Sequence, residues 1–357
     1  MQLGIIGLPQ SGKTTLFNAL TRGNVPTGIS GGKVEVHTAV IDVPDPRVGR
    51  LAALFEPKKI VHAKVTYADI AGLEGKASAG SITGPLLNTL SQMDGFIHVV
   101  RHFTNPSVPH SEGSVEPLRD ISAMETELML NDLIIVERKI TRLEEEQQRG
   151  GIGRDKNLVA REMVLFTKLQ EILSNEIPLR NETFSEEEEK LLSSYGLLSR
   201  KPQLIVVNQS EDQEPIAVET PYANTKAICM PAKLEMEIAQ LPPEEAQVFL
   251  EEYAIEEPSL NRFIRLSYEL LGQISFFTGS KKDVHAWTVS KGATAREAAG
   301  TIHTDMEKGF IRAEVINCEE LVSLGGLAEA RAEGKLRLEG KTYIVQDGDY
   351  IIIRFNV

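Results

Sequence analysis

Eight residues near the N-terminus, Gly7-Leu8-Pro9-Gln10-Ser11-Gly12-Lys13-Thr14, have the types and spacing of a phosphate-binding loop. Glycine at the first and sixth positions lets backbone N–H groups curl around a polyphosphate, where a Cβ atom would intrude. The lysine would reach the β- and γ-phosphates, and the threonine hydroxyl would ligate Mg²⁺. We therefore predict a site for a nucleoside triphosphate with Mg²⁺. Its phosphate-contacting residues would be Gly7, Gln10, Ser11, Gly12, Lys13, Thr14 and Thr15.

The elements around this loop are those that such a site requires. An apolar run from Leu3 to Ile6 predicts a strand before it, and residues 15–20 predict a helix after it, closed by Gly23. The N-terminus of that helix adds N–H donors and a dipole that favours an anion. The alternative is a glycine turn before an ordinary helix, and the strand, the spacing and the Lys-Thr pair together disfavour it.

A second strand, predicted from His62 to Ala68, leads into Asp69-Ile70-Ala71-Gly72. A carboxylate at this strand end suits Mg²⁺ held through water, so Asp69 and Thr14 are the predicted metal residues. The N–H group of Gly72 would face the γ-phosphate. Leu73 follows where Ras-like enzymes carry a water-orienting glutamine, and leucine cannot orient water. Hydrolysis is therefore expected to be slow, or another group must position the water.

Base recognition is predicted after the buried strand that ends at Asn208, at the edge where open α/β sheets bind ligands. Guanine-specific relatives carry Asn-Lys-x-Asp at this place. Here Gln209 replaces the lysine and Glu211 replaces the aspartate, so we expect ATP to bind at least as well as GTP. Ala232 opens the segment predicted to be the last loop beside the base.

Between these motifs the apolar period changes to helical steps of three and four residues, first from Leu118 to Leu143 and then from Val159 to Leu173. The glycine turn at 149–153 would join two antiparallel helices into a coiled-coil arm. Ser185 with Glu188 reads as a capping box. The predicted fold class is α/β: a P-loop domain (1–116 and 201–274), a helical coiled-coil insertion (117–200) and a C-terminal β-grasp domain (275–357). The predicted C-terminal strands are 284–289, 310–316, 335–338, 341–345 and 350–355.

Composition excludes several classes of protein. The chain has 357 residues, 41% hydrophobic and 25% charged, and no apolar run long enough to span a membrane, which favours a cytoplasmic protein without a membrane partner. Cys229 and Cys318 are the only cysteines, too few for a disulfide framework or a zinc cluster. The net charge of −13 argues against a free-standing nucleic-acid binder, so any RNA contact must use a local patch.

Taken together, these motifs resemble the Obg-like ATPase family of the YchF type along the whole chain. The other motifs that carry the resemblance are Pro44-Asp45-Pro46-Arg47, Gly113-Ser114-Val115-Glu116-Pro117, Ala286-Trp287-Thr288, the run from His303 to Phe310 and Asp347-Gly348-Asp349. The resemblance implies ATP preferred over GTP, a C-terminal TGS domain and association with ribosomes. It also implies that a histidine in a mobile loop replaces the missing glutamine, and His110 falls at the matching place. The chain departs from the family pattern at Gln10-Ser11 and in the first switch segment. It also departs in the second switch segment, which lies between Gly75 and Leu87.

Three functions follow as alternatives. The leading hypothesis is a slow, Mg²⁺-dependent ATPase that couples its nucleotide state to a ribosome- or RNA-associated partner. The altered switch segments leave open a nucleotide-stabilised adaptor with negligible turnover. A conventional GTPase switch is disfavoured by the Asn208-x-x-Glu211 sequence.

Overall fold

The computed structural model describes residues 1–25, 36–70, 82, 84–148, 155–216, 218, 225–253 and 255–356. Residue contacts divide the chain into two compact units, and each unit is assembled from two separate parts of the sequence. The first unit contains Met1–Ala39 and Thr66–Leu260, and the second contains Val40–Val65 and Asn261–Val357. Residues 40–65 therefore belong with the C-terminal part of the chain, although they lie between the two halves of the N-terminal part.

The first sheet has six strands in the order β2-β4-β1-β5-β6-β7. Their bounds are Gln2–Ile6 for β1, Val36–Asp42 for β2, Lys64–Ile70 for β4, Gly95–Arg101 for β5, Gln203–Asn208 for β6 and Thr225–Met230 for β7. The pairs β4–β1, β1–β5, β5–β6 and β6–β7 are parallel. Strands β5 and β6 are buried along their whole length, as expected for parallel strands covered on both faces. The carboxyl ends of these strands, where the predicted nucleotide residues lie, therefore meet at one edge.

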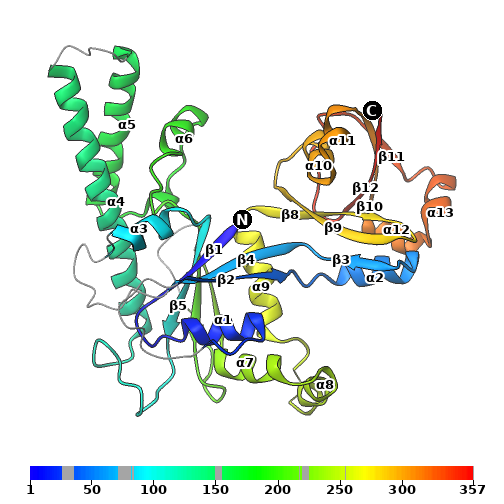
Figure 1. Ribbon diagram of the computed structural model, residues 1–357, viewed down its shortest axis with the longest axis horizontal. Helices are drawn as coiled ribbons and strands as arrows, with labels where there is room; N and C mark the ends of the chain where they lie inside the picture. The colour runs from blue at the N-terminus through cyan, green and yellow to red at the C-terminus, as the bar shows by residue number, and fades with distance from the viewer. Residues whose placement is uncertain are drawn as a thin grey trace. The chain divides into compact units, whose positions relative to one another are not determined.

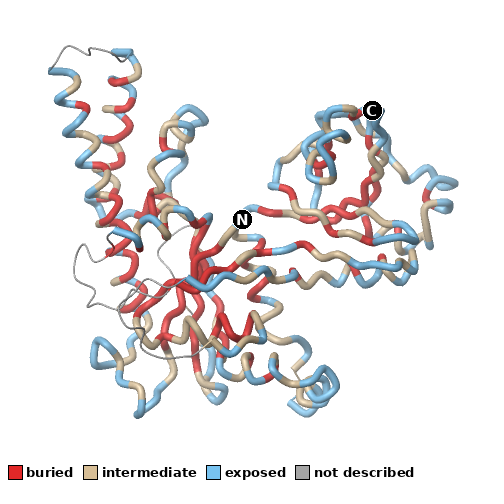
Figure 2. Tube along the Cα trace, viewed as in Figure 1, coloured by how far each residue is buried: buried red, intermediate tan, exposed pale blue. Residues whose placement is uncertain are grey.

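Helices cover this sheet and extend from it as an arm. They are α1 (Lys13–Thr21), α3 (Gly84–Ser91), α4 (Pro117–Gln148), α5 (Lys156–Ser174), a 3₁₀ turn (Leu179–Asn181), α6 (Glu186–Leu192), α7 (Ala232–Gln240) and α8 (Pro243–Glu252). Helices α4 and α5 run side by side as a hairpin (Figure 1), and the buried residues of Figure 2 follow its inner seam. The predicted turn at 149–153 lies outside the described residues. The capping box of Ser185 and Glu188 is confirmed at the start of α6.

The arm does not stand apart from the sheet. Met124 and Leu128, from the first turns of α4, belong to the same buried cluster as Ile6, Ala68 and Phe96 of the sheet. Further along the hairpin a separate seam forms, in which Phe166 and Leu169 of α5 are fully buried. The first turns of α4 are thus part of the core beneath the nucleotide motifs.

The second sheet is mixed and has the order β11-β10-β12-β8-β9-β3. Its strands are β3 (Lys59–Val61), β8 (Gln273–Gly279), β9 (Asp283–Ser290), β10 (Phe310–Asn317), β11 (Arg337–Glu339) and β12 (Asp349–Phe355). The remaining helices are α2 (Pro46–Phe55), α9 (Ser259–Leu270), α10 (Ala295–Ile302), α11 (Thr304–Lys308), α12 (Cys318–Leu324) and α13 (Leu327–Ala332). The alanines of α10 pack against Phe276, Val315 and Ile351, so the sheet folds around one helix as predicted.

Some local predictions were wrong. The predicted strand at 341–345 forms only an isolated bridge between Thr294 and Ile344, because the chain turns there on its way from β11 to β12. The segment that opens with Ala232 is the first turn of α7 and not a loop. Helix α2 and strand β3 were missed, although Asp45 caps α2 and Pro46 occupies its first position, a strong helix-start signal.

Candidate functional site

Two glycines allow the loop between β1 and α1 to pass close to its neighbours. Gly7 has φ 149° and Gly12 has φ 101°, values that L side chains rarely adopt. A Cβ atom on Gly7 would lie 2.2 Å from the carbonyl oxygen of Val99, and one on Gly12 would lie 2.1 Å from Nδ2 of Asn208. Substitution at either position would push the loop off the strand ends β5 and β6, so the motif needs glycine here for packing as well as for ligand access.

The N-terminus of α1 has the features of an anion site. Gly12 is its N-cap residue and has no side chain that could accept from the N–H groups of the first turn, at Lys13, Thr14 and Thr15. Uncapped N–H groups and the helix dipole together favour a phosphate at this end. Gln10, in the middle of the loop, has φ 61°, and Ser11 Oγ is buried without a hydrogen-bond partner among the described residues. The Ser11 hydroxyl is therefore a polar group of the loop that no described residue satisfies.

The side chain of Lys13 lies back across the loop that precedes it. Its Nζ atom donates to the carbonyl oxygens of Gly7 at 3.1 Å and Leu8 at 3.0 Å. The ammonium group thus lies against the backbone whose N–H groups would surround a polyphosphate, which is where a counter-charge is needed.

Thr14 and Asp69 are brought together although 55 residues separate them in the chain. Thr14 Oγ1 donates to Asp69 Oδ2 at 2.9 Å, because α1 begins at the carboxyl end of β1 and Asp69 lies near the same end of the adjacent strand β4. Burial raises the pKa of the Asp69 carboxyl, against the lowering effects of the Thr14 hydrogen bond and of the Lys13 and His37 charges. Oδ1 of Asp69 is buried and has no hydrogen-bond partner among the described residues.

This pair fits Mg²⁺. A hard cation prefers oxygen ligands, and one hydroxyl with one carboxylate leaves positions for water and phosphate oxygens. A cation would also relieve the desolvation that raises the Asp69 pKa. Among the described residues no group of three or more His, Cys, Asp or Glu side chains could hold a metal by itself. The site therefore suits a metal that arrives with a phosphate ligand, in which Thr14 and Asp69 would supply the protein's contribution.

Asn208 connects three parts of the site. Its Nδ2 donates to the carbonyl oxygen of Ser11 at 2.9 Å, and its Oδ1 accepts from the N–H of Ala232 at 3.1 Å. Both ends of the buried amide are thus used to tie the loop and the first turn of α7 to the end of β6. In this structure Asn208 is a tether for the site, which leaves base contacts to its neighbours.

Gln209 and Glu211 lie in different environments. Gln209 is buried, and its Nε2 donates to the carbonyl oxygen of Gln213 at 2.7 Å while its Oε1 has no partner among the described residues. Gln213 in turn accepts from the N–H of Ser210 and donates to the carbonyl oxygen of His102. Glu211 is exposed. An unsatisfied buried amide oxygen can accept from an amino group, whereas the carboxylate of Glu211 faces solvent.

His110 is not the exposed loop histidine that its composition suggests. Its Nε2 lies 2.9 Å from Oδ2 of Asp120, and the two side chains are only 4% and 3% exposed. Because its Nδ1 accepts from the N–H of Glu112 at 3.1 Å, Nε2 carries the proton that is donated to Asp120. Asp120 is held from the other side by Arg119. Both ring nitrogens of His110 are therefore engaged in the structure as it stands.

Several predicted residues lie outside the described part of the chain. They are Gly72, Leu73 and most of the stretch between Gly75 and Leu87 that departs from the family pattern. The roles predicted for these positions stay predictions.

Three groups at the site escaped the sequence analysis. His37 on β2 acts on the Asp69 carboxyl through its charge, Asp120 holds His110, and Gln213 supports Gln209. The pairing of Asp120 with His110 could have been predicted from sequence, because Asp120 lies in the first turn of a long predicted helix only ten positions after the histidine. No local pattern marks His37 or Gln213, because their partners are set by strand order and loop path.

Comparisons with known proteins identify matching families and relatives. The family of 50S ribosome-binding GTPases matches residues 2–139, and the YchF-GTPase C-terminal family, described as a protein of unknown function, matches residues 273–356. The ribosome-binding ATPase YchF of Bacillus subtilis is 42% identical over 366 residues, with 99% of each chain covered. That of Haemophilus influenzae is also 42% identical, again with 99% of each chain covered.

A solved structure agrees over a similar extent. The YchF GTPase of Schizosaccharomyces pombe superposes with a TM-score of 0.85 at 30% sequence identity, covering 99% of this chain and 97% of the other. The predicted family and fold class are thereby confirmed. With its phosphate loop, helical arm and C-terminal β-rich unit all matched, the chain belongs to the YchF family of ribosome-binding ATPases, the Obg-like P-loop proteins.

Proposed function

We propose that this chain binds ATP with Mg²⁺ at the loop between β1 and α1 and hydrolyses it slowly. The observation that supports this best is the contact of Thr14 Oγ1 with Asp69. It leaves Asp69 Oδ1 buried beside an uncapped helix N-terminus, with no hydrogen-bond partner in the described part of the chain. A structural role alone would satisfy both carboxylate oxygens within the protein. The curated relatives, named ribosome-binding ATPases, catalyse the reaction that such a site serves.

Each loop residue has a role in this proposal. The N–H groups at Gly12 to Thr15 bind the phosphates, Lys13 neutralises their charge, and Gly7, Gln10 and Ser11 shape the loop. Thr14 and Asp69 would hold Mg²⁺, and the bound ion would supply positive charge that offsets the negative charge of the phosphates. Gly72 is proposed to contact the γ-phosphate.

The base contacts are proposed to select adenine. Adenine presents an N6–H₂ donor and an N1 acceptor, and the buried Oε1 of Gln209 can accept from the amino group. A guanine-selecting carboxylate would have to come from Glu211, whose side chain is exposed and sits on a longer chain than aspartate. Asn208 and Ala232 serve here by fixing the wall of the base site through their mutual hydrogen bond.

His110 is proposed to position the attacking water in place of the missing glutamine. For this its imidazole must leave Asp120 and the N–H of Glu112, since both nitrogens are engaged. That requirement agrees with slow hydrolysis. The same observation favours a second candidate function, a nucleotide-stabilised adaptor with negligible turnover, in which the pairing of His110 with Asp120 is permanent.

A ribosome- or RNA-associated partner is proposed from the names of the relatives, and this would place the working protein in the cytoplasm. Among the described helices, none has the length and apolar character needed to cross a bilayer. The helical hairpin and the C-terminal unit are the proposed contact modules.

Titrations and single-turnover kinetics test these proposals. ATP with Mg²⁺ should bind at least as tightly as GTP, and Lys13→Ala should abolish or severely weaken both, as measured by calorimetry. Thr21→Ala, a change at the far end of α1, is the matched control and should bind as wild type does. ATP hydrolysis should then be followed with and without ribosomes. A rate no higher than that of Lys13→Ala in both conditions would favour the adaptor, and tighter GTP than ATP binding would refute the adenine assignment.

A further inference from the structure

The turn that follows strand β6, residues 209–213, is here called the base-side turn. It lies at the carboxyl edge of the first sheet, directly after the residue that holds the phosphate loop. The N–H of Gln209 donates to the carbonyl oxygen of Met230, at the end of β7, at 3.2 Å. The N–H of Gln213 donates to the carbonyl oxygen of Ser210 at 3.2 Å and closes the turn. The backbone of the turn is therefore fixed at the edge where open α/β sheets bind ligands.

The side chain of Gln213 ties this turn to the neighbouring strand end. Its Oε1 accepts from the N–H of Ser210 at 2.7 Å, and its Nε2 donates to the carbonyl oxygen of His102 at 3.2 Å. His102 directly follows β5, and its own N–H donates to the carbonyl oxygen of Asn208 at 2.8 Å. One glutamine side chain thus joins the base-side turn to a segment that is itself bonded to Asn208, inside the first unit.

The carbonyl oxygen of Gln213 decides which way the amide of Gln209 points. One atom of that amide lies 2.7 Å from this oxygen, and because a carbonyl oxygen only accepts, the atom must be the nitrogen of the NH₂ group. Oε1 therefore lies on the other side of the amide. It is buried and has no hydrogen-bond partner among the described residues, and Gln209 as a whole is 8% exposed. Buried side-chain oxygens are normally paired, so this oxygen suits a ligand that brings a donor.

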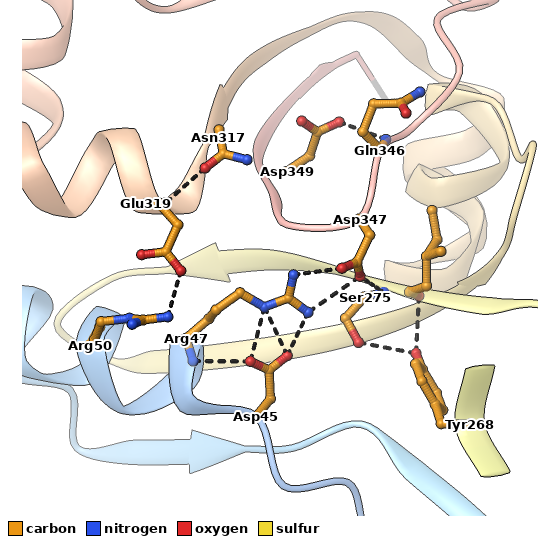
Figure 3. A network of polar contacts seen from close by, with 11 residues as sticks. Asp45, Arg47, Arg50, Tyr268, Ser275, Asn317, Glu319, Gln346, Asp347 and Asp349 are labelled. Carbon is orange, nitrogen blue, oxygen red and sulfur yellow. Dashed lines mark hydrogen bonds and ion pairs between the residues drawn. The ribbon is translucent and has the colours of Figure 1, made fainter. Parts of the chain in front are cut away.

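A polar network in the second unit shows the opposite condition (Figure 3). Arg47 donates to Asp45 at 2.8–3.1 Å and to Asp347 at 2.7–3.3 Å. Asp347 Oδ1 also accepts from the N–H of Ser275 at 2.9 Å. None of these four side chains has a buried nitrogen or oxygen atom that lacks a hydrogen-bond partner. That network is therefore complete by itself, whereas the amide of Gln209 is held firmly at one end only.

We propose that Gln213 is a positioning residue that determines base specificity, because it holds the Gln209 amide so that Oε1, and not the NH₂ group, faces position 6 of a bound purine. Adenine carries an amino donor at this position, whereas guanine carries an oxygen that only accepts. A fixed acceptor attracts the first base and repels the second, and the reversed amide would favour guanine. The inference rests on the proposed binding of ATP at this edge. It assigns the choice of base to a residue that does not itself touch the base.

Three nucleotides, each with Mg²⁺, separate this role from a structural one. ATP, GTP and purine riboside triphosphate, which lacks the 6-amino group, are titrated into the full-length chain by calorimetry. The wild-type chain should bind ATP about tenfold more tightly than purine riboside triphosphate, which corresponds to about 1.4 kcal/mol for one hydrogen bond. It should also bind ATP more tightly than GTP. In Gln209→Leu, ATP and purine riboside triphosphate should bind equally, because the acceptor is gone.

Variants of Gln213 then test the positioning role. Gln213→Leu removes both side-chain hydrogen bonds, and Gln213→Glu keeps the acceptor for the N–H of Ser210 but loses the donor to His102. Each should reduce the advantage of ATP over purine riboside triphosphate to about threefold or less, because the released turn lets the Gln209 amide rotate. Loosening of the site alone would weaken all three nucleotides by one factor and leave their ratios unchanged. Gln247→Leu is the matched control, since it removes an exposed hydrogen bond to Glu251 within α8.

The outcomes separate the inference from the proposed function. Wild-type ratios in both Gln213 variants overturn the positioning role, and so does a wild-type chain that binds ATP and purine riboside triphosphate equally. If Gln213→Leu fails to fold, Gln213→Glu and the wild-type titrations still decide the matter. Absence of binding of all three nucleotides by the wild-type chain overturns the proposed function, and the inference with it.

Discussion

The dual hydrogen bond of Asn208 gives the sharpest prediction for the nucleotide site. Asn208→Ala removes both bonds and leaves the carbonyl oxygen of Ser11 and the N–H of Ala232 without their partner. Each buried polar group left unpaired costs about 1–3 kcal/mol. Water can enter the space vacated by the amide and recover part of this. We therefore expect the free energy of unfolding to fall by about 2–4 kcal/mol.

The same variant separates a tether from a base contact. Because a tether holds the phosphate loop in place, its loss should weaken the binding of ATP and of GTP by similar factors. Each 1.4 kcal/mol of binding free energy needed to order the released loop corresponds to about a tenfold loss of affinity. The ratio of the two affinities should remain unchanged. Gln209→Ala, in contrast, should alter that ratio, since its buried Oε1 is the proposed adenine acceptor.

Urea unfolding and calorimetry with both nucleotides measure these effects. Glu211→Gln is the control for stability, because the exposed side chain should change the free energy of unfolding by no more than about 0.5 kcal/mol. The reasoning is refuted if Asn208→Ala is as stable as this control, or if it shifts the ATP-to-GTP ratio while leaving the free energy of unfolding unchanged.

Three further predictions concern single groups. Thr14→Ala should weaken ATP binding in the presence of Mg²⁺ far more than in EDTA, because it removes the hydroxyl that accompanies Asp69; equal losses in both titrations would contradict the metal assignment. His110→Ala should lower kcat by about 10²-fold with little change in ATP affinity, and an unchanged single-turnover rate would remove it from the mechanism. Burial raises the pKa of Asp132 to about 6, so the folded state takes up a proton before the unfolded state does, and stability from this group rises as the pH falls from 7 to 5. In urea unfolding, the free energy of unfolding of the wild-type chain should rise by about 1 kcal/mol over that interval relative to that of Asp132→Asn, and parallel pH profiles of the two chains would contradict the shift.

The phosphate loop, the central strands and the helical hairpin were predictable from sequence because their signals are local. Glycine and lysine spacing specify the loop, apolar runs specify β5 and β6, and a helical period specifies α4 and α5. The nearness of Thr14 to Asp69 also followed, since parallel strands present their carboxyl ends at one edge.

Other features depend on contacts between distant parts of the chain. The pairing of β3 with β9 joins residues more than two hundred positions apart, and three residues of β3 carry no pattern strong enough to be recognised alone. The burial of His110 depends on where the first turn of α4 lies, which its own loop composition cannot show. The helical period of the arm does not show that Met124 and Leu128 lie in the sheet's core. Deletion of the whole arm should therefore expose that core, and a deletion that begins beyond Leu133 is the sounder design.

The order of strands in the second sheet has a consequence for synthesis of the chain. Strand β12 (Asp349–Phe355) lies between β10 and β8, so the strand of this sheet that comes last in chain order is an interior strand. Until those residues emerge, β11 and β10 have no connection to β8, β9 and β3 within that sheet. Residues 40–65 must therefore wait for most of the polypeptide before their partners can form, and the nascent chain exposes α2 and β3 to chaperones or to other chains throughout that interval.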